Sequence, residues 1–165
     1  MAHSPRPAPA LSPANFLRQA HAVKQGGSLM AEDAATLLAL ADSYCAAAEH
    51  LRGIGRKMDA VSWHPYRFNA LQAIEHYLTA FLLIKGVAPD DARALQHSFK
   101  SRMKIADEKG LVLTKRTRAH IDSLDLSRDY LMSRYNPAAQ WTSHISRVDA
   151  TLHELAKKVG AASSS

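Results

Sequence analysis

Two ionisable side chains interrupt stripes of apolar residues, and they are the first candidates for chemistry in this sequence. Glu75 lies in a series spaced by three and four residues whose other members are Phe68, Leu71, Leu78 and Leu82. Arg128 lies in a second such series with Ile121, Leu124, Leu131 and Tyr135. Because an isolated charge is costly to bury, each of the two needs a partner or a water-filled cleft.

These charges predict an ion pair. The simplest arrangement pairs Glu75 with Arg128 or Arg134, in a polar cleft of the kind that often forms at a dimer interface. Two plainer arrangements stay open. One is an internal salt bridge that only fixes the packing register, and the other is a pair of long side chains at the edge of a stripe that reach out to solvent.

Positive charge is concentrated in one part of the chain. The sequence has 21 Lys and Arg against 15 Asp and Glu, a net charge of +6. Residues 93–134 hold 10 cations and 5 acids, so nearly the whole surplus (10 − 5 = +5) lies there. Such a field favours polyanions, and the candidate contacts are Arg102, Lys104, Lys115, Arg116 and Arg118. The alternative is a solvated surface that keeps the protein soluble.

Motifs for metal, nucleophilic and dinucleotide chemistry are missing. Cys45 is the single cysteine, no Cys and His spacing matches a zinc module, and neither H-E-x-x-H nor G-x-S-x-G occurs. Gly53-Ile54-Gly55 follows a predicted helix, whereas a dinucleotide fingerprint follows a strand. We therefore expect no metal and no cofactor.

The same composition predicts a cytoplasmic protein without a membrane partner. A lone cysteine fits a reducing compartment, and the first residues lack an apolar segment of signal-peptide length. The longest apolar run, residues 80–84, is far short of the ~18 residues that span a bilayer.

The elements that must position these side chains are all expected to be helices. Hydrophobic residues make up 47% of the chain and aromatic residues only 7%. Pro65 is expected in the first turn of one helix, His97 and Thr114 at the starts of two others, and Gly86 and Gly110 just after helix ends. The periodicity predicts helices over residues 13–24, 32–51, 65–85, 97–109, 114–135 and 142–159.

One domain suits a chain of 165 residues. We expect a disordered Pro-rich lead over residues 1–12, a single helical domain over 13–160 and a disordered tail over 161–165. No alternating pattern predicts a strand. The predicted fold class is therefore all-α, an antiparallel up-and-down bundle with one extra helix at each end.

Three stretches of the chain resemble the HEPN superfamily, small helical domains often encoded beside minimal nucleotidyltransferases. They are AIEHYLTAFLLIKG (73–86), QHSFKSRMKIADEKGL (96–111), whose His97 opens a helix, and SRDYLMSRYNP (127–137). Their order and spacing cover about residues 31–136. The resemblance implies a helical homodimer whose partner is RNA, a nucleotide or a nucleotidyltransferase protein.

The resemblance also implies a site. Active HEPN domains are metal-independent ribonucleases of toxin–antitoxin type, with an R-x4–6-H motif, often extended to R-x4-H-x-Y, whose Arg and His face each other across the dimer. Here Arg128 and Tyr135 match the motif, and Ser133 stands at the His position. A serine hydroxyl without a base beside it cannot exchange protons near neutral pH as imidazole does.

These features predict a non-catalytic domain whose cleft binds a ligand. The implied cleft residues are Arg128, Ser133, Arg134, Tyr135 and Glu75. One alternative is a metal-independent ribonuclease that uses another base, such as His97 or His76. A second alternative is a purely structural or regulatory helical partner protein.

Overall fold

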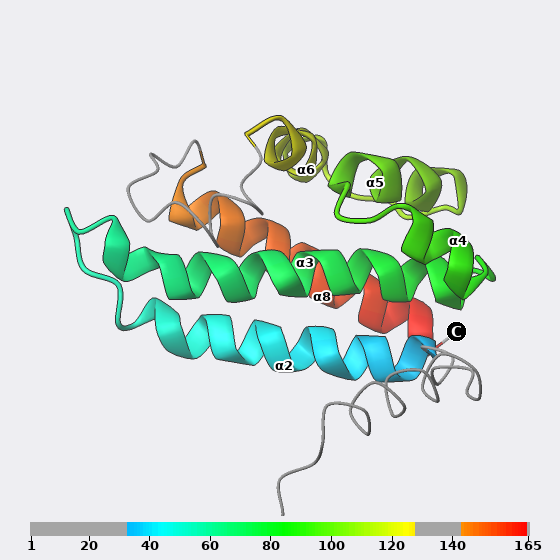
Figure 1. Cartoon of the computed structure of the whole chain (residues 1–165), viewed down its shortest axis with the longest axis horizontal. Coiled ribbons are helices and arrows are strands. Elements are labelled where there is room, and N and C mark those ends of the chain that lie inside the picture. Colours follow the sequence, from blue (N-terminus) through cyan, green and yellow to red (C-terminus); the bar gives the residue numbers. More distant parts are fainter. Residues whose placement is uncertain (1–32, 128–142, 165) are drawn as a thin grey trace, which may run out of the picture. The chain divides into compact units, whose positions relative to one another are not determined.

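The structure is a computed structural model of the whole chain, and it describes residues 33–127 and 143–164 (Figure 1). The chain divides into two units, Met1–Ala31 and Glu32–Ser165, and every described residue lies in the second. The described residues form six α-helices and one short 3₁₀-helix, with no strand among them. The all-α helical prediction is confirmed for this part of the chain. The predicted lead over 1–12 and helix over 13–24 lie outside it.

Helix α2 spans Ala34–Arg52 and buries one narrow face. The Asp33 carboxylate caps it by accepting a hydrogen bond from the backbone N–H of Thr36 at 2.5 Å. The buried residues follow at spacings of four, four and three: Leu37, Ala41, Cys45 and Ala48. Because three of these side chains are small, the neighbouring helix can approach closely.

Helix α3 spans His64–Ile84 and is the central helix of the described unit. Pro65 lies in its first turn, as predicted. Helices α2, α5 and α8 all pack against α3, and side chains such as Ile74, Leu78 and Leu82 are wholly buried. This surrounding explains why apolar residues occupy nearly every side of its second half.

Helix α8 spans Ile145–Ser163. Four of its buried residues, Val148, Leu152, Leu155 and Val159, recur at spacings of four and three, which is the periodicity expected of the helix predicted over residues 142–159. The helix also continues past the expected end, so the prediction of a disordered tail from residue 161 is wrong as far as Ser163. The reason is that Ala161 and Ala162 favour helix, and Ala162 packs against the core.

Three shorter helices lie between α3 and α8 in the sequence: α4 (Pro89–Ala94), α5 (Phe99–Glu108) and α6 (Lys115–Ser127). The predicted glycine stops are confirmed, since Gly86 and Gly110 have φ angles of 79° and 91°, which favour glycine. The predicted helix over 114–135 is described as far as Ser127, and its remaining residues lie outside the described ranges.

The helix starts follow the predictions with one exception. Thr114 caps α6, because its hydroxyl accepts a hydrogen bond from the backbone N–H of Thr117 at 3.3 Å. At α5 the cap is Ser98, whose hydroxyl accepts from the N–H of Ser101 at 3.1 Å. The prediction of His97 as the capping residue is wrong by one position, since its imidazole turns toward α3 instead.

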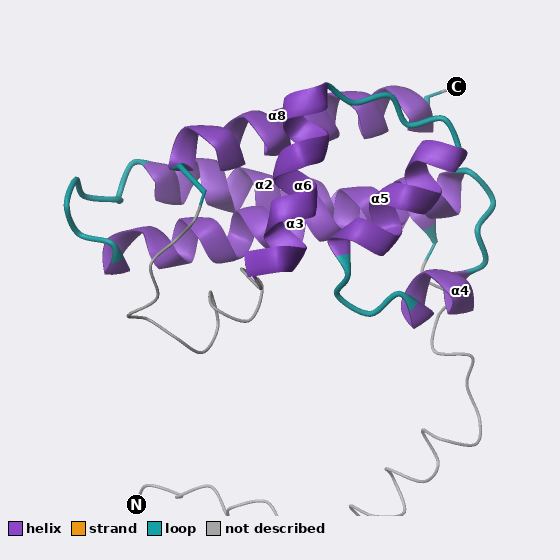
Figure 2. Ribbon diagram, turned by 90° about the horizontal axis from the view of Figure 1, so that it is seen from above, coloured by secondary structure: helices purple, strands orange, loops and turns teal. Residues whose placement is uncertain are grey.

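The long helices lie side by side in Figure 1, where α2 is antiparallel to α3 and α8 runs in the same direction as α3. The predicted up-and-down order is therefore not confirmed. Figure 2 shows α6 crossing over the long helices instead of following them. Because α6 packs against both α5 and α8, α8 contacts α6 as well as α3 and α2.

Candidate functional site

Glu75 is buried on α3, and both of its described charge partners come from the α4–α5 region. Its Oε1 lies 3.2 Å from Nη2 of Arg102 and 3.1 Å from Nδ1 of His97. The Glu75 and Arg102 side chains are 10% and 5% exposed, whereas the His97 side chain is 58% exposed. The expectation of a buried, paired carboxylate is met, but its described partners are not the expected ones. Arg128 and Arg134 lie outside the described residues.

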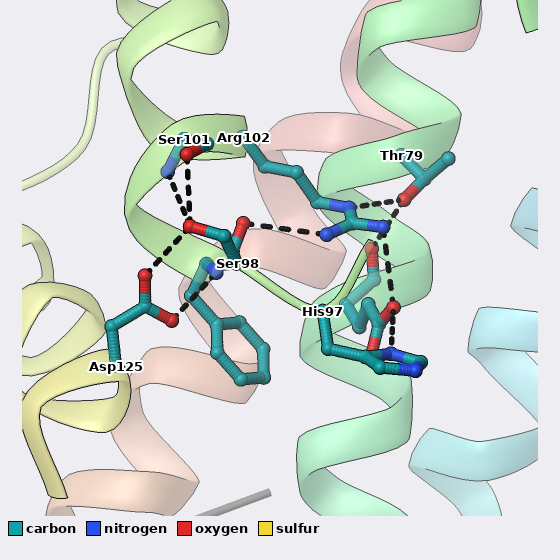
Figure 3. A network of polar contacts seen from close by, with 8 residues as sticks. Thr79, His97, Ser98, Ser101, Arg102 and Asp125 are labelled. Carbon is teal, nitrogen blue, oxygen red and sulfur yellow. Dashed lines mark hydrogen bonds and ion pairs between the residues drawn. The ribbon is translucent and has the colours of Figure 1, made fainter. Parts of the chain in front are cut away.

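Arg102 is held by contacts on two helices. Its Nε donates to the Thr79 hydroxyl on α3 at 2.9 Å, and its Nη1 donates to the backbone carbonyl of Ser98 at 3.3 Å. Figure 3 shows the guanidinium reaching from α5 toward Thr79. Arg102 is one of the predicted polyanion contacts, but its burial against Glu75 keeps its charge away from any surface ligand.

The sequence did carry a signal for this pair. Phe99, Arg102, Met103 and Ala106 are the buried residues of α5, and their spacing of three, one and three residues defines one helix face. Arg102 therefore interrupts an apolar stripe just as Glu75 does. Net charge does not distinguish Arg102, the cation of α5 that faces the core, from Lys100 and Lys104, which are exposed on the same helix.

Asp125 on α6 ties the start of α5 to the same region. Its carboxylate accepts hydrogen bonds from the backbone N–H groups of Phe99 and Lys100, both at 2.8 Å, and from the Ser98 hydroxyl at 2.8 Å. Figure 3 shows Asp125 below the first turn of α5. These contacts satisfy helix N-terminal amides that have no partner within the helix. The Glu75 cluster is thus part of the framework that docks α5 onto α3 and α6.

A pocket of about 410 Å³ adjoins the Glu75 cluster and includes His76, Thr79 and Arg93 in its lining. Its buried carboxylate and guanidinium neutralise one another, so the cluster presents little net charge to a ligand. The His97 imidazole is an exposed polar group of this lining, together with Arg93 and Gln96. We interpret the Glu75–Arg102 pair as an internal salt bridge that fixes how the helices pack. This is one of the two plainer arrangements that the sequence leaves open.

A second pocket, of about 550 Å³, lies between α6 and the start of α8. Its polar lining comes from one face of α6, with Arg116, His120 and Ser123, and from the residues that open α8, with Ser143, His144 and Arg147. No Asp or Glu is among the described residues that line it. The described lining therefore joins two guanidinium groups to hydroxyl and imidazole groups, with no carboxylate among its members.

A buried arginine shapes the floor of this α6–α8 pocket. Arg67 on α3 is 6% exposed, and it donates from Nη2 to the backbone carbonyl of Ser143 at 2.6 Å and from Nη1 to the Ser143 hydroxyl at 3.2 Å. Ser143 directly precedes His144, the N-cap of α8. Arg67 thus fixes the position of Ser143, which lines the pocket just before α8 begins.

His120 is the most constrained group in the lining. It is 5% exposed, and its Nδ1 lies 2.8 Å from the Thr151 hydroxyl. Its Nε2 is buried and has no hydrogen-bond partner among the described residues. Burial, followed by the charges of Arg147 and Arg67, lowers the pKa of His120 to about 4. The imidazole is therefore neutral near pH 7.

The other predicted polyanion contacts differ in their availability. Lys104 and Lys115 are exposed, and so is Arg116 in the lining of the α6–α8 pocket. Arg118 forms an ion pair with Asp107. No ion pair found among residues 33–127 and 143–164 involves Lys104, Lys115 or Arg116.

Arg116 is the only polar residue of this lining that the sequence analysis predicted as a site residue, and the missed residues include His120, Ser143 and Arg147. A weak signal existed for His120, because it lies next to Ile121 and four residues before Leu124 on a helix whose other face is charged. Ser143 and Arg147 carried none, since their role depends on where α6 crosses α8. The predicted cleft residues Arg128, Ser133, Arg134 and Tyr135 lie outside the described residues.

Two kinds of feature are not found among the described residues. Within the described ranges, no three His, Cys, Asp or Glu side chains gather in a way that could hold a metal ion. No helix in the same ranges has the length and apolar character needed to cross a membrane.

Comparison of the chain with protein-family models, with curated proteins and with solved structures found no match.

Proposed function

We propose that this protein is a non-catalytic, HEPN-like domain that binds RNA through its phosphate backbone. The observation that carries the proposal is the α6–α8 pocket, which both Arg116 and Arg147 line and whose described lining residues include no carboxylate. Guanidinium groups bind phosphate oxygens through paired hydrogen bonds, and they hold their charge at every physiological pH.

The surroundings of the pocket extend the positive surface. Lys115 precedes Arg116 in the first turn of α6 and is exposed. A polyanion bound at Arg116 would therefore also meet Lys115, and attraction to clustered cations is the usual basis of non-specific phosphate binding. Lys104 on α5 is exposed as well, and the net charge of +6 attracts polyanions to the protein as a whole.

RNA is chosen among polyanions because of the three HEPN-like stretches in the sequence. The same resemblance supports a homodimer, and the lone buried Cys45 fits a cytoplasmic location. An acidic protein, such as a nucleotidyltransferase partner, is the alternative that replaces RNA if the following experiment fails.

The test is fluorescence anisotropy of the full chain with a labelled single-stranded RNA of about 20 nucleotides over a series of salt concentrations. Affinity should fall steeply with salt, because each phosphate contact releases a counterion. The double variant Lys115→Ala/Arg116→Ala should bind several-fold more weakly, with a shallower salt dependence.

A matched control is the double variant Lys57→Ala/Lys157→Ala, which loses the same charge at exposed positions outside the pocket lining. Equal losses in the two double variants would mean that net charge alone attracts RNA. Undetectable binding at low salt would overturn the RNA proposal.

A further inference from the structure

The start of α8 has unused hydrogen-bonding capacity. The N-cap His144 makes no side-chain hydrogen bond to the helix, so the first-turn amides lack the side-chain acceptor that Asp33 provides for α2. Ser146 and Arg147 follow directly on the pocket wall. The amino-terminal end of a 19-residue helix also carries a partial positive charge.

A second and independent observation concerns His120. Although the imidazole lines the pocket and is 95% buried, its Nε2 lacks a partner among the described residues. The Nε of Arg147, which lines the same pocket from α8, is likewise buried without a described partner. Buried polar groups in folded proteins are almost always hydrogen-bonded. Two orphaned nitrogen atoms on side chains of one pocket lining therefore point to a ligand with several acceptor oxygens.

The donors around the pocket define that ligand. Arg116, Arg147 and the α8 amides supply positive charge, while hydroxyl groups and His120 supply further hydrogen bonds. A carboxylate has only two oxygens and one negative charge. A phosphomonoester has three terminal oxygens and a charge of about −1.5 to −2 near neutral pH, which suits convergent donors without a counter-charge.

We propose that the α6–α8 pocket is a binding site for one phosphomonoester group. Arg116, Arg147 and the first turn of α8 hold the group, and Nε2 of His120 is a buried hydrogen-bonding partner. The group comes from the phosphorylated end of an RNA or from a free mononucleotide, which present the same chemistry. This inference deepens the proposed function and rests on it only for the first source.

Ligand binding at this site would change the protonation of His120. The charged groups that face the imidazole are Arg147 from α8 and Arg67 from α3, with Arg116 on its own helix and His144 also in the lining. The arginines disfavour a proton on His120, and the dianion offsets them. The pKa of His120 therefore rises from about 4 when the site is filled. Binding is accordingly linked to proton uptake.

The first experiment observes His120 directly by NMR in the isotope-labelled full chain. Adenosine monophosphate is titrated at several pH values, and adenosine is the control ligand without phosphate. The expected result is a saturable shift of the His120 ring signals and a rise of its pKa by one unit or more with the monophosphate alone. Absence of both changes at saturating monophosphate would overturn the proposal.

The second experiment separates the two sources of phosphate. One RNA sequence is compared with a 5′-phosphate and with a 5′-hydroxyl. A preference of about fivefold or more for the phosphorylated RNA, lost in Arg116→Ala and kept in Lys157→Ala, supports the site with RNA as the source. A monophosphate that binds and shifts His120, combined with equal binding of the two RNAs, supports the site with a free nucleotide as the source.

The outcomes also separate this inference from the proposed function. RNA binding that ignores the terminal phosphate, with no effect of monophosphate on His120, would overturn the phosphomonoester site and leave RNA binding standing. Monophosphate binding without RNA binding would overturn the RNA proposal and leave the phosphomonoester site standing. Because Arg116 and Ser146 are exposed, Arg116→Ala and Ser146→Glu test the site even if substitution of the buried His120 prevents folding. Ser146→Glu should abolish phosphate binding by placing a negative charge at the pocket wall.

Discussion

Glu75 and Arg102 form a buried ion pair between α3 and α5, with 3.2 Å between Oε1 and Nη2 and no more than 10% of either side chain exposed. The two residues are 27 positions apart in the sequence. Arg102 also donates to Thr79 and to the Ser98 carbonyl, and His97 also approaches Glu75. Such pairs are costly to break from one side, because the remaining charge is left desolvated.

Glu75→Ala should therefore lower the free energy of unfolding by about 3 kcal/mol, as expected for removing one partner of a buried pair. Glu75→Gln should cost less, since it keeps the shape and part of the hydrogen bonding. Urea denaturation measures both. The double variant Glu75→Leu/Arg102→Met should be more stable than Arg102→Met combined with an intact Glu75. An unchanged midpoint in Glu75→Ala would show that the carboxylate is solvated.

This pair shows what a helical sequence pattern can predict and where it stops. The position of Glu75 in an apolar stripe predicts burial and a charged partner, and both are found. The partner depends on how α5 docks against α3, which is set by the turn after Gly86, the Ser98 cap and Asp125 on another helix. Periodicity within one helix carries no information on that docking, so Arg102 could be recognised only by its own apolar neighbours.

Asp125 should be important for the start of α5, although it lies on α6. Its carboxylate accepts from the backbone N–H groups of Phe99 and Lys100, so Asp125→Ala removes a charged cap. We expect a loss of about 1–2 kcal/mol in stability, the usual cost of a lost helix cap. Hydrogen exchange should speed up at the amides of Phe99 and Lys100 in particular. Asp122→Ala, which removes an exposed carboxylate one turn earlier on α6, is the control and should leave these amides protected.

His120 should make the stability of the protein depend on pH. Its pKa is about 4 in the folded chain and near its usual 6.5 in the unfolded chain, because burial disfavours the charged form. Between these values the unfolded chain binds a proton that the folded chain does not. The contribution of His120 to the free energy of unfolding is therefore complete above about pH 6.5. It is lost as the pH falls toward 4, and it amounts to about 3 kcal/mol in total.

The measurement compares urea denaturation at pH 7.5 and pH 4.5 for the natural protein and for His120→Gln. The variant should lose clearly less stability between the two pH values. His50→Gln, which replaces an exposed histidine of α2, should behave like the natural protein. Parallel losses in all three proteins would mean that the His120 ring is hydrated in the folded state.

The α6–α8 pocket was beyond the reach of sequence reasoning for a physical reason. The positive stretch over residues 93–134 indicated polyanion binding, and Arg116 within it does line the pocket. However, Arg147 and Ser143 lie outside that stretch, and they join Arg116 only because α6 crosses the start of α8 (Figure 2). Net charge also cannot separate Arg116 from Arg102, one of which is exposed and the other buried.

The HEPN resemblance predicts a homodimer. Light scattering of the full chain at micromolar concentration should give a mass near twice 18.1 kDa. The mass should not change over a series of salt concentrations if the subunits associate through apolar faces, because salt screens charges and not apolar contacts. A strictly monomeric protein would remove the argument for a cleft shared by two chains.

The last prediction concerns Ser133, which the HEPN resemblance aligns with the histidine of active ribonucleases. A hydroxyl cannot take up and return a proton near pH 7 without a base, whereas an imidazole can. The natural protein should therefore bind RNA without cleaving it when metal ions are removed by a chelator. Ser133→His restores the spacing of Arg128, His and Tyr135, so this variant should gain metal-free cleavage. Ser133→Ala is the matched control and should stay inactive.

Arg128→Ala in the Ser133→His background shows whether any cleavage uses the restored motif. Activity that disappears in the double variant supports the motif, because cleavage would then need both Arg128 and the introduced histidine. Activity that persists points to a contaminating nuclease. Robust metal-free cleavage by the natural protein, lost in Arg128→Ala, would contradict the non-catalytic proposal. Such cleavage would require a base other than Ser133. His97, with its exposed imidazole beside Glu75, would then be the first residue to substitute.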